Sequence, residues 1–196
     1  MKQNEQKMTK YIILLRGINV GGHRKVPMGE LRELFTKSGF KNVQTYIQSG
    51  NVFLESSDNS KKIKIIAEEL ILQHFGFEVT TLVKTESELK TIFGSCPFQN
   101  DVKEKSYFMM LDSLADSTGL EEVSELSYKE EEIHITDNCI YFSSANGYGR
   151  TKFNSNFFER KLKVNATARN YKTMLKLLAM VKETEVKLQN LPIFVL

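Results

Sequence analysis

The sequence has few of the residues that build metal centres, disulfides and membrane spans. Its two cysteines, Cys96 and Cys139, lie far apart and match neither a metal-binding pair nor a disulfide framework, so we expect reduced, buried thiols. The three histidines are scattered without the spacing of a zinc site, and no metal is therefore expected. No apolar run is long enough to cross a bilayer, and residues 1–10 are polar without a signal-peptide core. We therefore expect a cytoplasmic protein with no membrane partner.

Charge is unevenly distributed along the chain. A hydrophobic content of 41% predicts a packed core, and the formal net charge of +3 is too small to indicate a partner. Residues 115–132 nevertheless hold seven acidic side chains against one lysine, whereas residues 146–176 hold eight basic side chains against Glu159 alone. Two solvated helix faces would account for this pattern, but so would an anion-binding surface on the basic segment.

Hydrophobic periodicity predicts the same order of elements twice. The first copy consists of a strand at 11–18, a helix at 27–39, a hairpin of 43–48 and 51–56, a helix through 63–71 and a strand at 77–84. The second consists of a strand at 106–112, a helix through 120–126, a hairpin of 132–136 and 139–144, a helix through 157–162 and a short strand at 165–168. We predict an α+β fold of two tandem ferredoxin-like (βαββαβ) subdomains with a closing C-terminal helix. The expected parts are a polar tail (1–10), the first subdomain (11–85), a linking helix and loop (86–104), the second subdomain (105–170), and the closing helix and tail (171–196).

The stretch RGINVGGHRK, residues 16–25, follows the first predicted strand. Gly17 and Gly22 have the spacing of a P-loop, but His23 and Arg24 stand where its lysine and hydroxyl belong, and the helix begins too late. A dinucleotide fingerprint is also missing, so no cofactor is expected. Exposed backbone N–H groups beside basic side chains can form an anion-binding nest, although the glycines could equally serve only a tight turn.

Two further segments carry similar chemistry. The hairpin sequence QSGN (48–51) is expected at the same end of its sheet as the first glycine loop, while GYGRTK (147–152) is expected to approach Arg169 and Asn170 at the start of the last helix. Turn formation by QSGN, and pairing of the arginines with the acidic segment 115–132, remain alternatives. The candidate ligand-binding residues are Arg16, Asn19, Gly21, Gly22, Lys25, Gln48, Ser49, Asn51, Arg150, Lys152, Arg169 and Asn170.

Taken together, LLRGINVGG, KVPM, TYIQSGNV, GYGRTK and TARNYKTMLKLL resemble a bacterial family, domain of unknown function family 1697. The resemblance extends from about Tyr11 to Met180, with Tyr171 where the family commonly has tryptophan. It implies a cytoplasmic α+β protein of two related ferredoxin-like subdomains, and it implies no activity.

Three functions fit these observations. The first is binding of a phosphate-bearing ligand, a nucleotide or nucleic acid, through the basic glycine loops. The second is an enzyme acting on a phosphorylated or acyl substrate between the subdomains, although no GxSxG elbow or Cys/His signature is present. The third is a protein-interaction module using the closing helix and the apolar tail LPIFVL. An RNA-binding sheet face is not expected, because the central strands are apolar on both sides and both faces should be covered.

Overall fold

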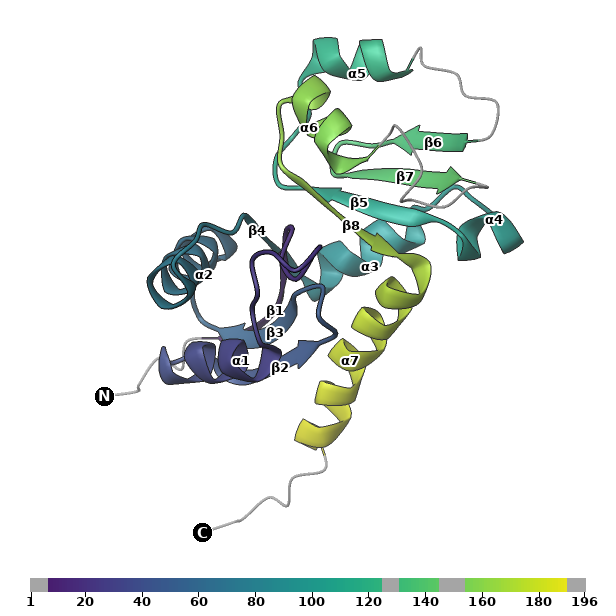
Figure 1. Ribbon diagram of the computed structural model, residues 1–196. Helices are drawn as coiled ribbons and strands as arrows, with labels where there is room; N and C mark the ends of the chain where they lie inside the picture. Colours follow the sequence, from purple (N-terminus) through teal and green to yellow (C-terminus); the bar gives the residue numbers. More distant parts are fainter. Residues whose placement is uncertain (1–6, 125–130, 145–153, 190–196) are drawn as a thin grey trace.

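The computed structural model describes residues 7–124, 131–144 and 154–189, which form seven helices and two four-stranded sheets (Figure 1). The N-terminal unit consists of β1 (Thr9–Leu15), α1 (Met28–Lys37), β2 (Lys41–Tyr46), β3 (Asn51–Ser56), α2 (Ser60–Phe75) and β4 (Thr81–Thr85). The C-terminal unit consists of β5 (Tyr107–Leu111), α5 (Ser117–Ser124), β6 (Glu131–Ile135), β7 (Cys139–Ser144), α6 (Ser155–Leu162) and β8 (Ala166–Asn170). The remaining helices are α3 (Glu86–Gly94), α4 (Asn100–Glu104) and α7 (Tyr171–Gln189).

The two sheets have the same strand order. It is β2-β3-β1-β4 in the N-terminal unit and β6-β7-β5-β8 in the C-terminal unit, with every neighbouring pair antiparallel. The mixed α+β architecture is therefore as predicted, and it is consistent with two tandem ferredoxin-like subdomains. The short helix α4 was not among the predicted elements.

Several element boundaries differ from the prediction. Strand β1 ends at Leu15 rather than residue 18, because Gly17 and Asn19 adopt positive φ angles of 66° and 55° that an extended strand cannot contain. The last strand, β8, runs to Asn170, and Arg169 pairs with Phe108 of β5. The prediction that Arg169 lies at the start of the last helix was therefore wrong, because ladder pairing with β5 keeps it in the strand, whereas Asn170 ends β8 directly before α7.

Asparagine side chains cap two helices that lie close to the contact between the units. The Asn170 Oδ1 atom accepts a hydrogen bond of 2.8 Å from the backbone N–H of Thr173, at the start of α7. The Asn154 side chain accepts one of 3.2 Å from the N–H of Phe157 in α6. Each cap satisfies a backbone donor that the first helical turn leaves unpaired, and each fixes where its helix begins.

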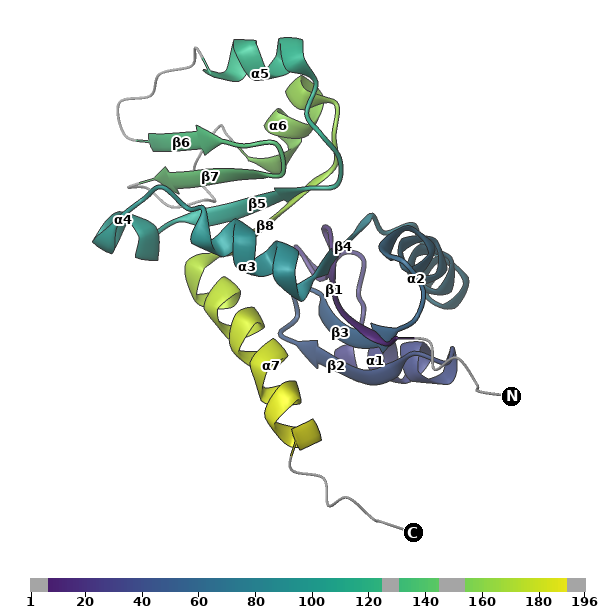
Figure 2. The ribbon, with the colours of Figure 1, turned by 180° about the vertical axis from the view of Figure 1, so that it is seen from behind.

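Three apolar clusters arrange the elements in layers. One lies between the N-terminal sheet and helices α1 and α2, and a second between the C-terminal sheet and helices α5 and α6. The third joins the opposite faces of both sheets with α3 and α7, which lie beside one another in both views (Figures 1 and 2). Both faces of each sheet are thus covered, as predicted from the apolar central strands. Cys96 and Cys139 are free and buried in this third cluster, which confirms the prediction of buried thiols.

Polar contacts also tie the two units together. Lys64 of α2 forms an ion pair of 3.2 Å with Asp112, and Lys84 Nζ donates to the backbone carbonyl of Leu111 at 2.9 Å. Burial by itself raises the pKa of Asp112. Hydrogen bonds from Asn165 and the interaction with Lys64 together outweigh that effect, so the pKa of Asp112 lies below its ordinary value. Within the described helices, none combines the length and apolar character needed to cross a membrane.

Candidate functional site

The glycine loop after β1 is a folded turn pinned by Asn19. Its Nδ2 atom donates to the backbone carbonyls of Val26 (3.0 Å) and Gln48 (2.9 Å), and its Oδ1 atom accepts from the N–H of Val26 at 2.8 Å. The same side chain thus closes the loop and joins it to the β2–β3 hairpin. The structure brings the loop and the hairpin together, as predicted, and it gives the Asn19 side chain a role within the fold.

The hairpin passes so close to β1 that Gly50 has no room for a side chain. Gly50 has φ +76°, and a Cβ atom there would lie 2.7 Å from Leu15 Cβ and from Ile18 Cδ1. Its carbonyl accepts from the N–H of Leu15 at 2.8 Å. The next residue, Asn51, is fully buried and donates to the carbonyl of Tyr46 at 2.9 Å. The turn therefore presents buried carbonyl oxygens toward the C-terminal unit.

Arg169 of β8 reaches across from the C-terminal unit into this turn. Its guanidinium donates to six acceptors: Asn51 Oδ1, Thr167 Oγ1 and the carbonyls of Leu15, Ser49, Gly50 and Ala168, at 2.6–3.2 Å. None of these acceptors is a carboxylate, although Arg169 is only 6% exposed. Burial lowers the pKa of Arg169 to about 10, so the side chain remains charged at neutral pH. We call this arrangement the Arg169 hub.

Arg16 makes a second contact between the units, to helix α6. Its Nη2 atom donates to Asn156 Oδ1 at 2.6 Å and forms a salt bridge with Glu159 Oε2. The other oxygen of Glu159 accepts from the backbone N–H of Ala166 at 2.7 Å. The Arg16 Nε atom is buried without a hydrogen-bond partner. An unpaired buried donor is rare in folded proteins, and the residue that carries it lines a cleft.

A cleft of about 450 Å³ lies between the two units at this point. Its described wall residues are 15–18 with Val20, Ser49, 154–156 and 166–169. Arg16 and Arg169 both line it, and these described walls include no acidic side chain. The first turn of α6 also faces it, and backbone N–H groups at a helix start favour anions. The cleft can therefore hold a negatively charged group, with donors from both units.

The candidate ligand-binding residues differ in where they lie relative to the cleft. Arg16, Ser49 and Arg169 line the cleft, and Asn51 accepts a hydrogen bond from Arg169 without being part of the described wall. Asn170 is occupied as the cap of α7, on the surface. The exposed residues that are not in the described wall are Gly21, Gly22, Lys25 and Gln48. Arg150 and Lys152 lie outside the described residues, so their place at the site stays a prediction from sequence.

Sequence reasoning missed five polar residues at or near the cleft. Four line it and one lies nearby: Asn154, Ser155, Asn156, Thr167 and the nearby Glu159. Only Glu159 carried a usable signal, because it is the single acid in the basic segment 146–176. The alternative that the arginines pair with the acidic segment 115–132 was wrong for Arg169, none of whose acceptors is a carboxylate. Lysines pair with that segment instead. Lys161 bonds Glu122 at 2.6 Å and Lys163 bonds Asp116 at 3.3 Å.

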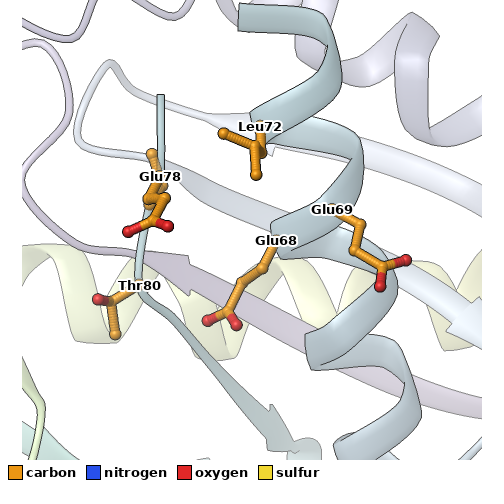
Figure 3. A pocket seen from close by; sticks show the side chains of 6 residues that line it. Glu68, Glu69, Leu72, Glu78 and Thr80 are labelled. Carbon is orange, nitrogen blue, oxygen red and sulfur yellow. The ribbon is translucent and has the colours of Figure 1, made fainter. Parts of the chain in front are cut away.

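A second pocket, of about 340 Å³, is lined by acidic side chains, those of Glu68, Glu69 and Glu78. Figure 3 shows Glu68 and Leu72 pointing from α2 toward the segment that carries Glu78 and Thr80. The Glu68 carboxylate already has a hydrogen-bond partner within the fold, because it accepts from the backbone N–H of Thr81 at 2.8 Å. Within the described ranges, no group of three or more histidines, cysteines or acids could hold a metal ion. We find no ligand chemistry for this pocket.

The fold and the cleft together define a two-unit α+β protein with basic side chains where the units meet. The chain belongs to the family described as protein of unknown function (DUF1697), whose model matches residues 8–141. The GYGRTK and TARNYK motifs lie beyond that match. The structure is similar to that of conserved bacterial protein SP0830 from Streptococcus pneumoniae, at 27% identity and a TM-score of 0.71, over 89% of this chain and 99% of that one. No curated protein matches the chain.

Proposed function

We propose that this protein binds a small phosphate-bearing ligand, of nucleotide size, in the cleft between its two units. The observation that carries the proposal is the pairing of Arg16 and Arg169 in a cleft whose described walls include no carboxylate. Arginine is suited to phosphate because its planar guanidinium offers several donors in a fixed geometry. Residues 11–85 and 105–170 are proposed as the two subdomains that contribute these arginines.

The Arg169 hub supports this proposal through its charge rather than through free donors. Its five N–H groups are all directed at protein acceptors, and none of the six acceptors carries a charge. A buried cation without a counter-ion raises the electrostatic potential of the hollow beside it, because a low-dielectric surrounding screens it poorly. An anion in the cleft would supply the missing negative charge.

Arg16 is the residue proposed to touch the ligand. Its side chain is 27% exposed, and its Nε donor lacks a protein partner. Backbone N–H groups of the glycine loop and of the first turn of α6 are candidates for the remaining phosphate oxygens. Arg150 and Lys152 are proposed as further contacts on the grounds of sequence alone.

The dimensions and walls of the cleft favour a small ligand over a nucleic acid strand. A volume of about 450 Å³ is within the range of about 300–1,000 Å³ that is typical of small-molecule sites. Proteins that bind single strands stack the bases on aromatic side chains, and no aromatic residue is among the described walls of this cleft.

Isothermal titration calorimetry with adenosine 5′-monophosphate (AMP) and with inorganic phosphate tests the proposal. We expect binding by the parent chain, and a loss of about 10- to 100-fold in affinity for Arg16→Ala, because a hydrogen bond to a charged group contributes about 1.5–3 kcal/mol. Arg32→Ala is the matched control, since Arg32 is exposed on α1 and is not part of the described cleft wall.

Absence of heat with both probes at millimolar concentration, or equal weakening by the two variants, would refute the proposal. Binding only to oligonucleotides, with strong salt dependence, would favour nucleic acid instead. Consumption of the nucleotide during the titration would extend the function to that of an enzyme.

A further inference from the structure

We propose that Asn154, the cap of α6, and Asn156, in its first turn, bind the ligand of the cleft through their side-chain amide N–H groups. Both residues line the cleft. This inference rests on the proposed function, because it names the groups that meet the phosphate beside Arg16. It also defines that part of the ligand as a group that accepts hydrogen bonds and donates none.

The start of α6 fixes the orientation of the Asn154 amide. An asparagine side chain has one oxygen that accepts and one nitrogen that donates. The Asn154 oxygen accepts from the backbone N–H of Phe157 at 3.2 Å, so the nitrogen is left for another partner. Asn154 is exposed at the cleft wall, and its Nδ2 atom donates to none of the residues that the structure describes.

Asn156 lies directly beside Arg16. Its Oδ1 atom accepts from Arg16 Nη2 at 2.6 Å, and the opposite orientation of the amide would bring two donors together. Within the described part of the chain, the Nδ2 atom of Asn156 has no acceptor, and the Arg16 side chain donates through Nη2 alone. The remaining donors of Arg16 and the Asn156 amide can therefore act on one ligand.

Other polar groups of the wall already accept hydrogen bonds within the protein. Arg169 donates to Thr167 Oγ1 and to the carbonyls of Leu15, Ser49 and Ala168, at 2.9–3.1 Å. The two asparagine oxygens are occupied as well, so the asparagines offer donors to a ligand. A second donor placed against them would leave both unpaired, at a cost in free energy. A phosphate group, whose oxygens accept, fits this part of the cleft, whereas an amine does not.

The first test replaces Asn154 with serine, which keeps the cap and removes the amide donor. Serine caps helices about as well as asparagine, because its hydroxyl oxygen accepts from the same backbone N–H. We expect Asn154→Ser to weaken AMP binding by about 5-fold or more in calorimetry, since a hydrogen bond to a charged group is lost.

Asn59→Ser is the matched control for this variant. Asn59 caps α2 in the same way, by accepting from the N–H of Lys62 at 3.0 Å, and it is not part of the described cleft wall. The same substitution at this second cap should leave the affinity for AMP within 2-fold of the parent.

A second test observes the asparagine amides directly by NMR. The variants Asn154→Ser, Asn156→Ala and Asn59→Ser each remove one pair of side-chain amide signals, which assigns that pair in the parent spectrum. On addition of inorganic phosphate to the parent chain, we expect the signals of Asn154 and Asn156 to shift and those of Asn59 to stay in place. Sodium chloride at the same ionic strength should move none of them. Phosphate has no aromatic ring, so the shifts report contact with its oxygens.

The outcomes distinguish the inference from the function on which it rests. If the parent binds AMP and Arg16→Ala weakens binding, but Asn154→Ser binds as tightly as the parent, the inference is wrong and the proposed function stands. Asparagine signals that do not move with phosphate, or equal weakening by Asn59→Ser, would likewise overturn it. If the parent binds neither AMP nor phosphate, both proposals are wrong. Urea unfolding shows whether Asn154→Ser is folded, and if it is not, the NMR signals of the parent chain decide.

Discussion

Replacing Arg169 with methionine should destabilise the whole molecule, because the guanidinium holds buried acceptors from both units. The change leaves six oxygen acceptors without this donor. The Gly50 carbonyl keeps its hydrogen bond from the N–H of Leu15, so the loss of the Arg169 donor counts at the other five acceptors. At about 1 kcal/mol each, the lower end for buried unsatisfied groups, this costs about 5 kcal/mol. Methionine also removes a buried charge, and lowering the pKa from 12.5 to about 10 corresponds to about 3 kcal/mol. The expected net loss is therefore about 2 kcal/mol.

Urea unfolding followed by circular dichroism measures this loss directly. For a chain of this length, about 2 kcal/mol corresponds to a fall in Tm of about 4–8 °C. Arg160→Met is the control, since Arg160 is exposed on α6, and it should change the stability by less than about 0.5 kcal/mol. A loss below about 1 kcal/mol for Arg169→Met would refute the view that the hub carries the contact between the units.

Three further changes probe other parts of the structure by urea unfolding. Gly50→Ala should cost about 2–4 kcal/mol because its Cβ would meet two side chains at 2.7 Å, whereas Gly76→Ala, at a similar φ with open space around it, should cost about 1 kcal/mol; equal losses would contradict the close contact. The pKa of Asp112 is lowered on folding, so its contribution to stability is present above its unfolded pKa of about 4 and is lost as the pH falls through the lower folded value. Between pH 6 and pH 2 the variant Asp112→Asn should therefore lose less stability than the parent. Equal losses of stability in the two chains over this pH range would contradict the argument. Tyr141→Phe removes a buried hydroxyl that donates to the carbonyl of Ile92 at 2.8 Å, and a loss of about 1–2 kcal/mol is expected, with no loss as the contrary result.

The repeated order of elements could be predicted because it depends on local patterns. Apolar periodicity and turn residues identified both copies, and the same patterns indicated that both sheet faces are covered. The positions at which the strands end could not be predicted as well. The end of β1 depends on positive φ angles at Gly17 and Asn19, and the end of β8 depends on ladder pairing with β5, which no local pattern reveals.

The contacts of the site could not be predicted because its partners are distant in sequence. Arg169 and Asn51 are 118 positions apart, and Arg16 and Glu159 are 143 positions apart. Sequence reasoning marked Arg16, Asn51 and Arg169 from their residue types, yet it could not show that Asn51 receives its hydrogen bond from Arg169 rather than from a ligand. Glycine and asparagine in turns satisfy the backbone as readily as they bind an anion.

The motifs QSGN and ARN meet at the Arg169 hub, and RGIN is joined to QSGN through the hydrogen bond from Asn19 to the carbonyl of Gln48. These contacts explain much of the chemistry of the motifs without a ligand. Asn19 closes its loop, Gly50 permits the close approach of the hairpin, and Arg169 pairs with the carbonyls that this approach exposes. What the hub does not satisfy is the charge of Arg169 and the Nε donor of Arg16. Arg16 and Arg169 line the same cleft. The hydrogen bonds of the Arg169 hub serve the fold, whereas the proposed binding of an anion depends on the neighbouring Arg16, so the two can be tested separately. Variants of Arg16 and Asn154 can therefore test binding while the hub stays intact.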